Sequence, residues 1–69
     1  MRVAQMTKTE GLNAHNIGCL FPIVTETRLP DGDYYVVEIP EDLDVYNTGG
    51  QLIVGSMMFL AKAKAREIK

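Results

Sequence analysis

Hydrophobic and polar residues alternate near the start of the chain and again around its middle, which predicts β-strands. Residues 2–7, "RVAQMT", alternate over a short span and predict a first strand. Residues 19–29, "CLFPIVTETRL", and 34–40, "YYVVEIP", are rich in β-branched and aromatic residues, which suit the pleated surface of a sheet. Residues 8–18 contain several glycine and asparagine turn formers, and they predict a loop.

The stretch "PDGD" (residues 30–33) separates the two strongest predicted strands. Pro30 presets φ for a turn, and Gly32 can reach a positive φ without a Cβ clash. An antiparallel hairpin is therefore expected in the centre of the chain.

The segment after the hairpin predicts three short elements. Pro40 ends the second arm, and residues 41–47, "EDLDVYN", can form a helical turn whose acidic start suits the helix dipole. Residues 47–50, "NTGG", predict a turn. Residues 51–54, "QLIV", predict a buried strand.

Residues 55–69, "GSMMFLAKAKAREIK", fit two patterns. A helix would gather five apolar residues on one stripe, namely Met57, Leu60, Ala61, Ala65 and Ile68. A strand would alternate small or aromatic residues with basic ones, since Phe59, Ala61, Ala63 and Ala65 are interleaved with Lys62, Lys64 and Arg66. Alanine and basic residues favour the helix slightly.

A chain of 69 residues with 46% hydrophobic residues is expected to form one globular domain over residues 1–69. The predicted segments make this domain mainly β. The expected core consists of Val3, Leu20, Ile23, Val24, Tyr35, Val37, Ile39, Leu52, Val54, Met57 and Phe59.

Four stretches together resemble the small SH3-like β-barrels, in particular the short accessory proteins of phages and other mobile elements. "RVAQMT" matches the first strand, and "NIGCLFPIVTE" matches a strand entered through an Asn-x-Gly turn. "DGDYYVVEIP" matches the hairpin return, and "QLIVGSMMFLA" matches the last strands. The resemblance implies a small SH3-like barrel with a central hairpin and a possible C-terminal helix. It also implies a binding module that uses loops and one face.

The net charge is only −2, but acidic residues gather in the middle of the chain and basic residues near its ends. An acidic rim around the hairpin and its exit, with two aromatic anchors, is the predicted surface for another protein, because rim charges set association rates and tyrosines carry interface energy. The predicted partner-binding residues are Asp31, Asp33, Tyr34, Glu41, Asp42, Asp44 and Tyr46. The protein is therefore expected to be a small cytoplasmic adaptor or modulator that acts by binding another protein.

Nucleic-acid binding is the alternative function. It would use a basic C-terminal tail made of Lys62, Lys64, Arg66 and Lys69. Tyr34, Tyr35 and Phe21 would stack on bases. A sequence pI of about 5.2 and the acidic middle argue against it, because both repel phosphate.

No motif indicates an enzyme, a metal site or a cofactor. Cys19 and His15 lack an orienting acid for nucleophilic catalysis and are too few to hold zinc. "PDGDYY" lacks the alternating acids of a calcium loop, and "EDLD" offers three carboxylates without a histidine. The protein is expected to be non-catalytic.

The sequence also leads to expectations about cellular location and self-association. No apolar run approaches the about 18–20 residues of a membrane span, no signal peptide is evident, and a lone cysteine suits a reducing compartment. Cytoplasm is therefore predicted. The four consecutive large apolar residues 57–60 cannot all face one small core, so a homodimer is expected.

Overall fold

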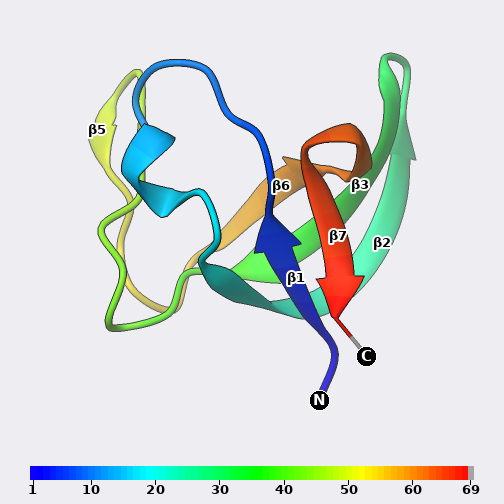
Figure 1. Cartoon of the computed structure of the whole chain (residues 1–69), viewed down its shortest axis with the longest axis horizontal. Coiled ribbons are helices and arrows are strands. Elements are labelled where there is room, and N and C mark those ends of the chain that lie inside the picture. Colours follow the sequence, from blue (N-terminus) through cyan, green and yellow to red (C-terminus); the bar gives the residue numbers. More distant parts are fainter. Residues whose placement is uncertain (69) are drawn as a thin grey trace.

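The computed structural model describes residues 1–68 and shows a mainly β chain, as predicted (Figure 1). The elements of this part are β1 (Val3–Met6), η1 (Ala14–Asn16), β2 (Leu20–Leu29), β3 (Gly32–Glu38), β4 (Tyr46–Asn47), β5 (Gly50–Gln51), β6 (Met57–Ala61), η2 (Lys62–Lys64) and β7 (Ala65–Ile68), where η marks a single turn of 3₁₀-helix. Within residues 1–68, none of the helical turns has the length and apolar character that crossing a bilayer requires.

Five strands form one antiparallel sheet in the order β6-β3-β2-β1-β7, and β4 pairs with β5 in a separate small hairpin. The long strand β2 is shared between two neighbours. Its first residues, 20–22, pair with β1, and residues 23–29 pair with β3. A bulge between Ile23 and Thr25 marks this change of partner, and such bulges bend a strand.

The expected closed barrel is not formed. β6 and β7 are the outer strands of the sheet, and they do not pair with each other within the described residues. Only the three residues of η2 separate them, and β7 pairs with β1 at the opposite side of the sheet. Both outer strands therefore have one edge without a strand neighbour.

The central hairpin is confirmed. Leu29 and Gly32 are the last paired residues, so Pro30 and Asp31 form a two-residue turn. Gly32 has a φ of 144°, a value that favours glycine because it has no Cβ.

The core lies between the curled strands and is smaller than the sequence indicates. Tyr35, Val37 and Ile39 are buried as expected, and Ile23 and Leu52 pack against the core while partly buried. The other buried apolar residues are Ala4, Met6, Phe21, Val45, Leu60 and Ala65.

Several expected core residues lie on the wrong face. Val3 is only half-buried, and the exposed ones are Leu20, Val24, Val54, Met57 and Phe59. β2 is apolar on both faces near its start, so alternation alone does not fix which face turns inward. The bulge then changes which positions of β2 face inward. Before it the odd-numbered Phe21 is buried, and after it the even-numbered Glu26 lies opposite the buried Tyr35.

Two predicted elements of the second half are wrong, and for the tail the strand pattern holds while the helix does not. Residues 57–68 form β6, η2 and β7, because pairing with β3 and β1 outweighs the helix propensity of alanine and lysine. Residues 41–47 contain only a short turn, closed by the Leu43 N–H donating to the Pro40 carbonyl at 3.3 Å. Residues 51–54 leave the strand after Gln51, and Ile53 is 79% exposed.

Candidate interaction surface

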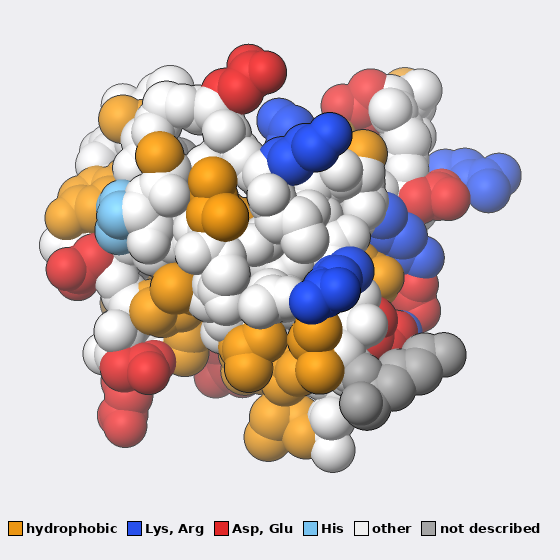
Figure 2. All heavy atoms as spheres, viewed as in Figure 1, with side chains coloured by type: hydrophobic (Ala, Val, Ile, Leu, Met, Phe, Trp, Pro, Cys, Tyr) orange, Lys and Arg blue, Asp and Glu red, His pale blue; other side chains and the backbone are white. Residues whose placement is uncertain are grey.

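The predicted acidic surface is divided between two ends of the molecule. Asp31, Asp33 and Tyr34 lie at the tip of the β2–β3 hairpin, whereas residues 41–46 lie in the segment that leads into β4. Figure 1 shows the hairpin tip and the β4–β5 hairpin at opposite sides of the molecule. Figure 2 shows acidic side chains spread around the outline of the visible face rather than gathered in one patch.

The two aspartates of the hairpin tip already have partners within the chain. The Tyr34 hydroxyl donates to Asp31 Oδ2 at 2.6 Å, and Arg28 Nε donates to Asp33 Oδ1 at 2.9 Å. The hydrogen bond to Asp31 raises the pKa of the Tyr34 hydroxyl, and Asp33 raises the pKa of Arg28. Both carboxylates are exposed; Asp31 keeps its charge beside the neutral hydroxyl, whereas the charge of Asp33 is partly balanced by Arg28.

Asp44 and Tyr46 anchor the loop that follows β1. The Asp44 carbonyl accepts hydrogen bonds from His15 Nε2 and Asn16 Nδ2, both at 2.9 Å. The Asn13 side chain bonds the Tyr46 backbone twice, accepting from its N–H at 2.8 Å and donating to its carbonyl at 2.6 Å. Asn16 is the buried polar residue of the described chain and is 1% exposed. Asn13 and Asn16 thus hold the loop after β1 against the chain around β4, and we call these two residues the asparagine clamp.

Sequence reasoning treated Asn13 and Asn16 as turn formers and did not detect the clamp. Their partners lie 28 to 33 positions away, so no local signal marks them.

The basic residues expected to form a tail are divided by internal contacts. Lys62 Nζ donates to Glu26, and Arg2 donates to Glu26 and Glu67 at 2.8 Å. Arg66 Nε donates to Gln5 Oε1 at 2.9 Å.

These contacts have electrostatic and structural consequences. Lys62 and Arg2 lower the pKa of Glu26, and Glu26 in turn raises the pKa of Lys62. The alternative site is therefore not one continuous cluster, and its fourth member, Lys69, lies outside the described residues. Of its proposed stacking residues, Phe21 and Tyr35 are buried, which leaves Tyr34.

A patch of apolar side chains covers the outer face of the β3–β6 pair, and we call Tyr34, Val36, Met57 and Phe59 the apolar face. Val36 and Phe59 are cross-strand partners, and the Tyr34 and Phe59 rings meet edge-on with centroids 6.2 Å apart. Met57 is 62% exposed and Phe59 is 58% exposed. Val36, Met57, Met58 and Phe59 also line a hollow of about 250 Å³.

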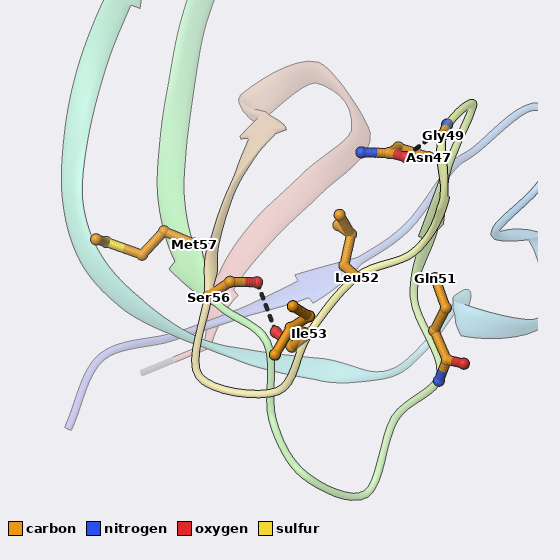
Figure 3. A pocket seen from close by; sticks show the side chains of 7 residues that line it. All are labelled: Asn47, Gly49, Gln51, Leu52, Ile53, Ser56 and Met57. Carbon is orange, nitrogen blue, oxygen red and sulfur yellow. Dashed lines mark hydrogen bonds between the residues drawn. The ribbon is translucent and has the colours of Figure 1, made fainter.

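A larger open hollow of about 470 Å³ lies between the β4–β5 hairpin and the start of β6 (Figure 3). Figure 3 shows Asn47 and Leu52 pointing into this space, whereas Met57 extends away from it. Ser56 Oγ donates to the Ile53 carbonyl at 2.5 Å, and Asn47 Oδ1 accepts from the Gly49 N–H at 2.8 Å. The lining residues carry no ionisable side chain, and the hydroxyl of Ser56 has no acid or base beside it among them.

The residues weighed for catalysis do not converge. His15 contacts the Asp44 carbonyl, and its ring lies 6.0 Å from the Tyr46 ring, while Cys19 is a free thiol packed against the core. Over residues 1–68, no group of three or more histidine, cysteine, aspartate or glutamate residues is placed to hold a metal ion. Absence of catalysis and of a metal stays a prediction.

No protein family, curated protein or solved structure matches the chain. The fold and the surfaces define a small antiparallel β protein whose most distinctive exposed feature is the apolar face.

Proposed function

We propose that the protein is a non-catalytic binding module that recognises another protein through the apolar face. The exposure of Met57 and Phe59 beside Val36 carries the proposal, because clustered large apolar side chains on a small surface mark interaction sites. Methionine adapts its shape to a partner, and aromatic residues contribute much of the energy at interfaces.

The acidic rim has a secondary role in this proposal. Glu41 and Asp42 are exposed, and within residues 1–68 their side chains make no hydrogen bond or ion pair. Such charges steer a basic partner and set the salt dependence of association more than the final affinity. Tyr34, which the sequence predicted as an aromatic anchor beside the acidic rim, is also part of the apolar face.

Nucleic-acid binding is the second candidate, and one observation favours it. Lys8 and Lys64 line the same cleft as Tyr34 and Phe59, so two cations lie beside two aromatic rings. Single-stranded nucleic acids are bound by such combinations. The short basic footprint makes this the weaker candidate.

We also propose that the sheet has an SH3-like arrangement. The pairing of β1 with β7 and the sharing of bent β2 between two neighbours support an SH3-like arrangement. A relationship to phage accessory proteins stays a prediction. The free thiol of Cys19 supports a reducing compartment, so we retain the cytoplasm as the proposed location.

The test is affinity capture from a lysate of the source cells, with and without nuclease. Wild type is compared with Met57→Lys and Phe59→Lys on the apolar face. Ile53→Lys is the matched control, because Ile53 is 79% exposed and is not part of that face. We expect a protein that survives nuclease, is lost with either apolar-face variant and is retained by the control.

Two further variants separate the candidates. Neutralising Glu41 and Asp42 should slow association and reduce its salt dependence. Neutralising Lys8 and Lys64 should abolish a capture that nuclease also removes if nucleic acid is the ligand, whereas a protein held by the apolar face should be weakened but still captured after nuclease. Capture that requires nucleic acid, or that ignores both apolar-face variants, would refute the proposed function.

A further inference from the structure

The free edge of β6 lines a cleft of about 210 Å³. One wall is residues 58–61 of β6, and the other comes from β1 and the loop after it. The cleft is lined by Met6, Lys8, Thr9, Asn13, Tyr34, Met58, Phe59, Leu60, Ala61 and Lys64. Because this cleft lies beside a strand edge, its wall includes main-chain groups as well as side chains.

The pairing of β6 with β3 shows which main-chain groups face the cleft side. The Ile39 N–H donates to the Ser56 carbonyl at 2.9 Å, which shows that the N–H of Ile39 points toward β6 in this register. Hydrogen-bonded pairs alternate along an antiparallel ladder, so Met58 and Leu60 bond to β3, and Met57, Phe59 and Ala61 direct their N–H groups away from it. Within residues 1–68, β6 has no strand neighbour on this side, so no ladder hydrogen bond uses these three N–H groups.

This edge lacks the features that usually protect a strand. The sequence of β6, "MMFLA", contains no charge and no proline, and its pairing with β3 has no bulge. Natural proteins block such edges with charges, prolines or bulges, or cover them, because an open edge pairs with another strand.

The opposite wall of the cleft is fixed in place and restricts what can enter. The N–H groups of Thr7 and Lys8 donate to the Lys64 carbonyl at 2.8 and 3.2 Å, and Asn13 is held by Tyr46. Neighbouring strands lie about 4.8 Å apart, so the cleft could take only a single extended segment beside β6. The edge of a second folded sheet would bring further strands into the loop wall.

The charge of the cleft selects the chemistry of that segment. Lys8 and Lys64 are its ionisable cations, and no ion pair involves them within the described chain. Both lysines are exposed, and an acidic side chain on the bound segment would meet them near the C-terminal end of β6.

We propose that the cleft binds an extended, acidic peptide segment of the partner protein, which adds to the sheet as a strand beside β6. The apolar face then contacts side chains of the same segment. This inference rests on the proposed function and specifies how its partner is recognised.

Substitution at Ala61 tests the edge without disturbing the fold. Ala61 has φ −59°, close to the value that proline requires, and its N–H points away from β3. Ala61→Pro therefore removes one edge donor and keeps the β3–β6 ladder. Ala61→Ser is the matched control, because serine is small and keeps the N–H.

The probe is a display library of random peptides about ten residues long, the upper length of ordinary strands. Selected peptides are measured by titration against wild type, both Ala61 variants and the charge-reversed Lys8→Glu/Lys64→Glu protein. We expect acidic, strand-forming peptides whose affinity falls about tenfold with Ala61→Pro and stays unchanged with Ala61→Ser. The charge-reversed protein should bind these peptides more weakly than wild type, and bound peptide should slow amide exchange at Phe59.

Several results would overturn the inference. These are selected peptides that bind Ala61→Pro as tightly as wild type, a library that yields no acidic binders, or a cleft occupied by oligothymidylate or by a second copy instead. If a captured protein is lost with Phe59→Lys but retained by Ala61→Pro, the proposed function stands and the strand-addition inference fails.

Discussion

The ammonium group of Lys62 lies 5.1 Å from the centroid of the Tyr35 ring. Lys62 also donates to Glu26, which is the cross-strand neighbour of Tyr35 and accepts a second hydrogen bond from Arg2. The contact places a cation over an aromatic face that closes the core at this end. A residue expected to bind nucleic acid thus connects η2 to β2 and β3.

Acid is expected to weaken this contact. Lys62 and Arg2 lower the pKa of Glu26 below its ordinary value of 4.5, so their contribution to stability is present above that pH and is lost as the pH falls through the lowered pKa. The midpoint of urea unfolding should therefore drop for wild type below about pH 4.5 more than for Glu26→Gln.

Two controls accompany the pH series. Glu41→Gln should keep the wild-type pH dependence, because the Glu41 side chain has no partner among the described residues. High salt should shrink the effect, since the paired side chains are more than one third exposed. Identical pH curves for wild type and Glu26→Gln would contradict the role of this network.

Paired isoleucine substitutions test the position of the core. Ile39 is 1% exposed and Ile53 is 79% exposed. Ile39→Val should lower the free energy of unfolding by about 0.5–1.5 kcal/mol, whereas Ile53→Val should change it by less than about 0.5 kcal/mol. Urea unfolding measures both, and equal effects would show that Ile39 is not in the core.

Removing the asparagine clamp should loosen the segment before β4. Asn16→Ala removes a buried side-chain donor to the Asp44 carbonyl, and we expect a loss of about 1–3 kcal/mol in the free energy of unfolding. Asn47→Ala is the control, because the Asn47 hydrogen bond to Gly49 is exposed. Amide exchange at Tyr46 should accelerate in Asn13→Ala, and unchanged exchange there would argue against the clamp.

Self-association stays a prediction, now with a defined surface. Met57 and Phe59 expose more than half of their area, and a second copy is one way to cover them. Light scattering at rising concentration should approach the mass of a dimer, and Met57→Gln should shift it back toward the monomer. Leu12→Gln is the control, because Leu12 is 55% exposed and lies in the loop after β1. A constant monomer mass would contradict self-association.

Local chemistry allowed part of the fold to be predicted. The β2–β3 hairpin followed from Pro30 and Gly32, whose backbone preferences act within a few residues, and the alternation of residues 2–7 located β1. The inward face of β2 could not be predicted, because its start is apolar on both sides and the bulge near Val24 leaves no local signal.

The surface was harder to predict than the fold. Lys62, Arg66, Asp33 and Asp31 were assigned to partner sites from charge alone, yet each contacts a side chain of its own chain. Most of these pairings depend on strands brought together by the sheet, as Lys62 and Glu26 are 36 positions apart. The apolar face was hidden for the same reason, since pairing with β3 decided which side chains of β6 point outward.

The pairing of β1 with β7 also has a consequence for the order of folding. Arg2 and Glu67 are 65 positions apart, whereas the β2–β3 hairpin closes over a two-residue turn. Closing the longer loop costs more chain entropy, so the hairpin and its pairing with β6 can form first and lower the cost of the distant pair. The β1–β7 pair is then a late event whose loss should mainly speed unfolding, in contrast to damage at the hairpin, which should slow refolding.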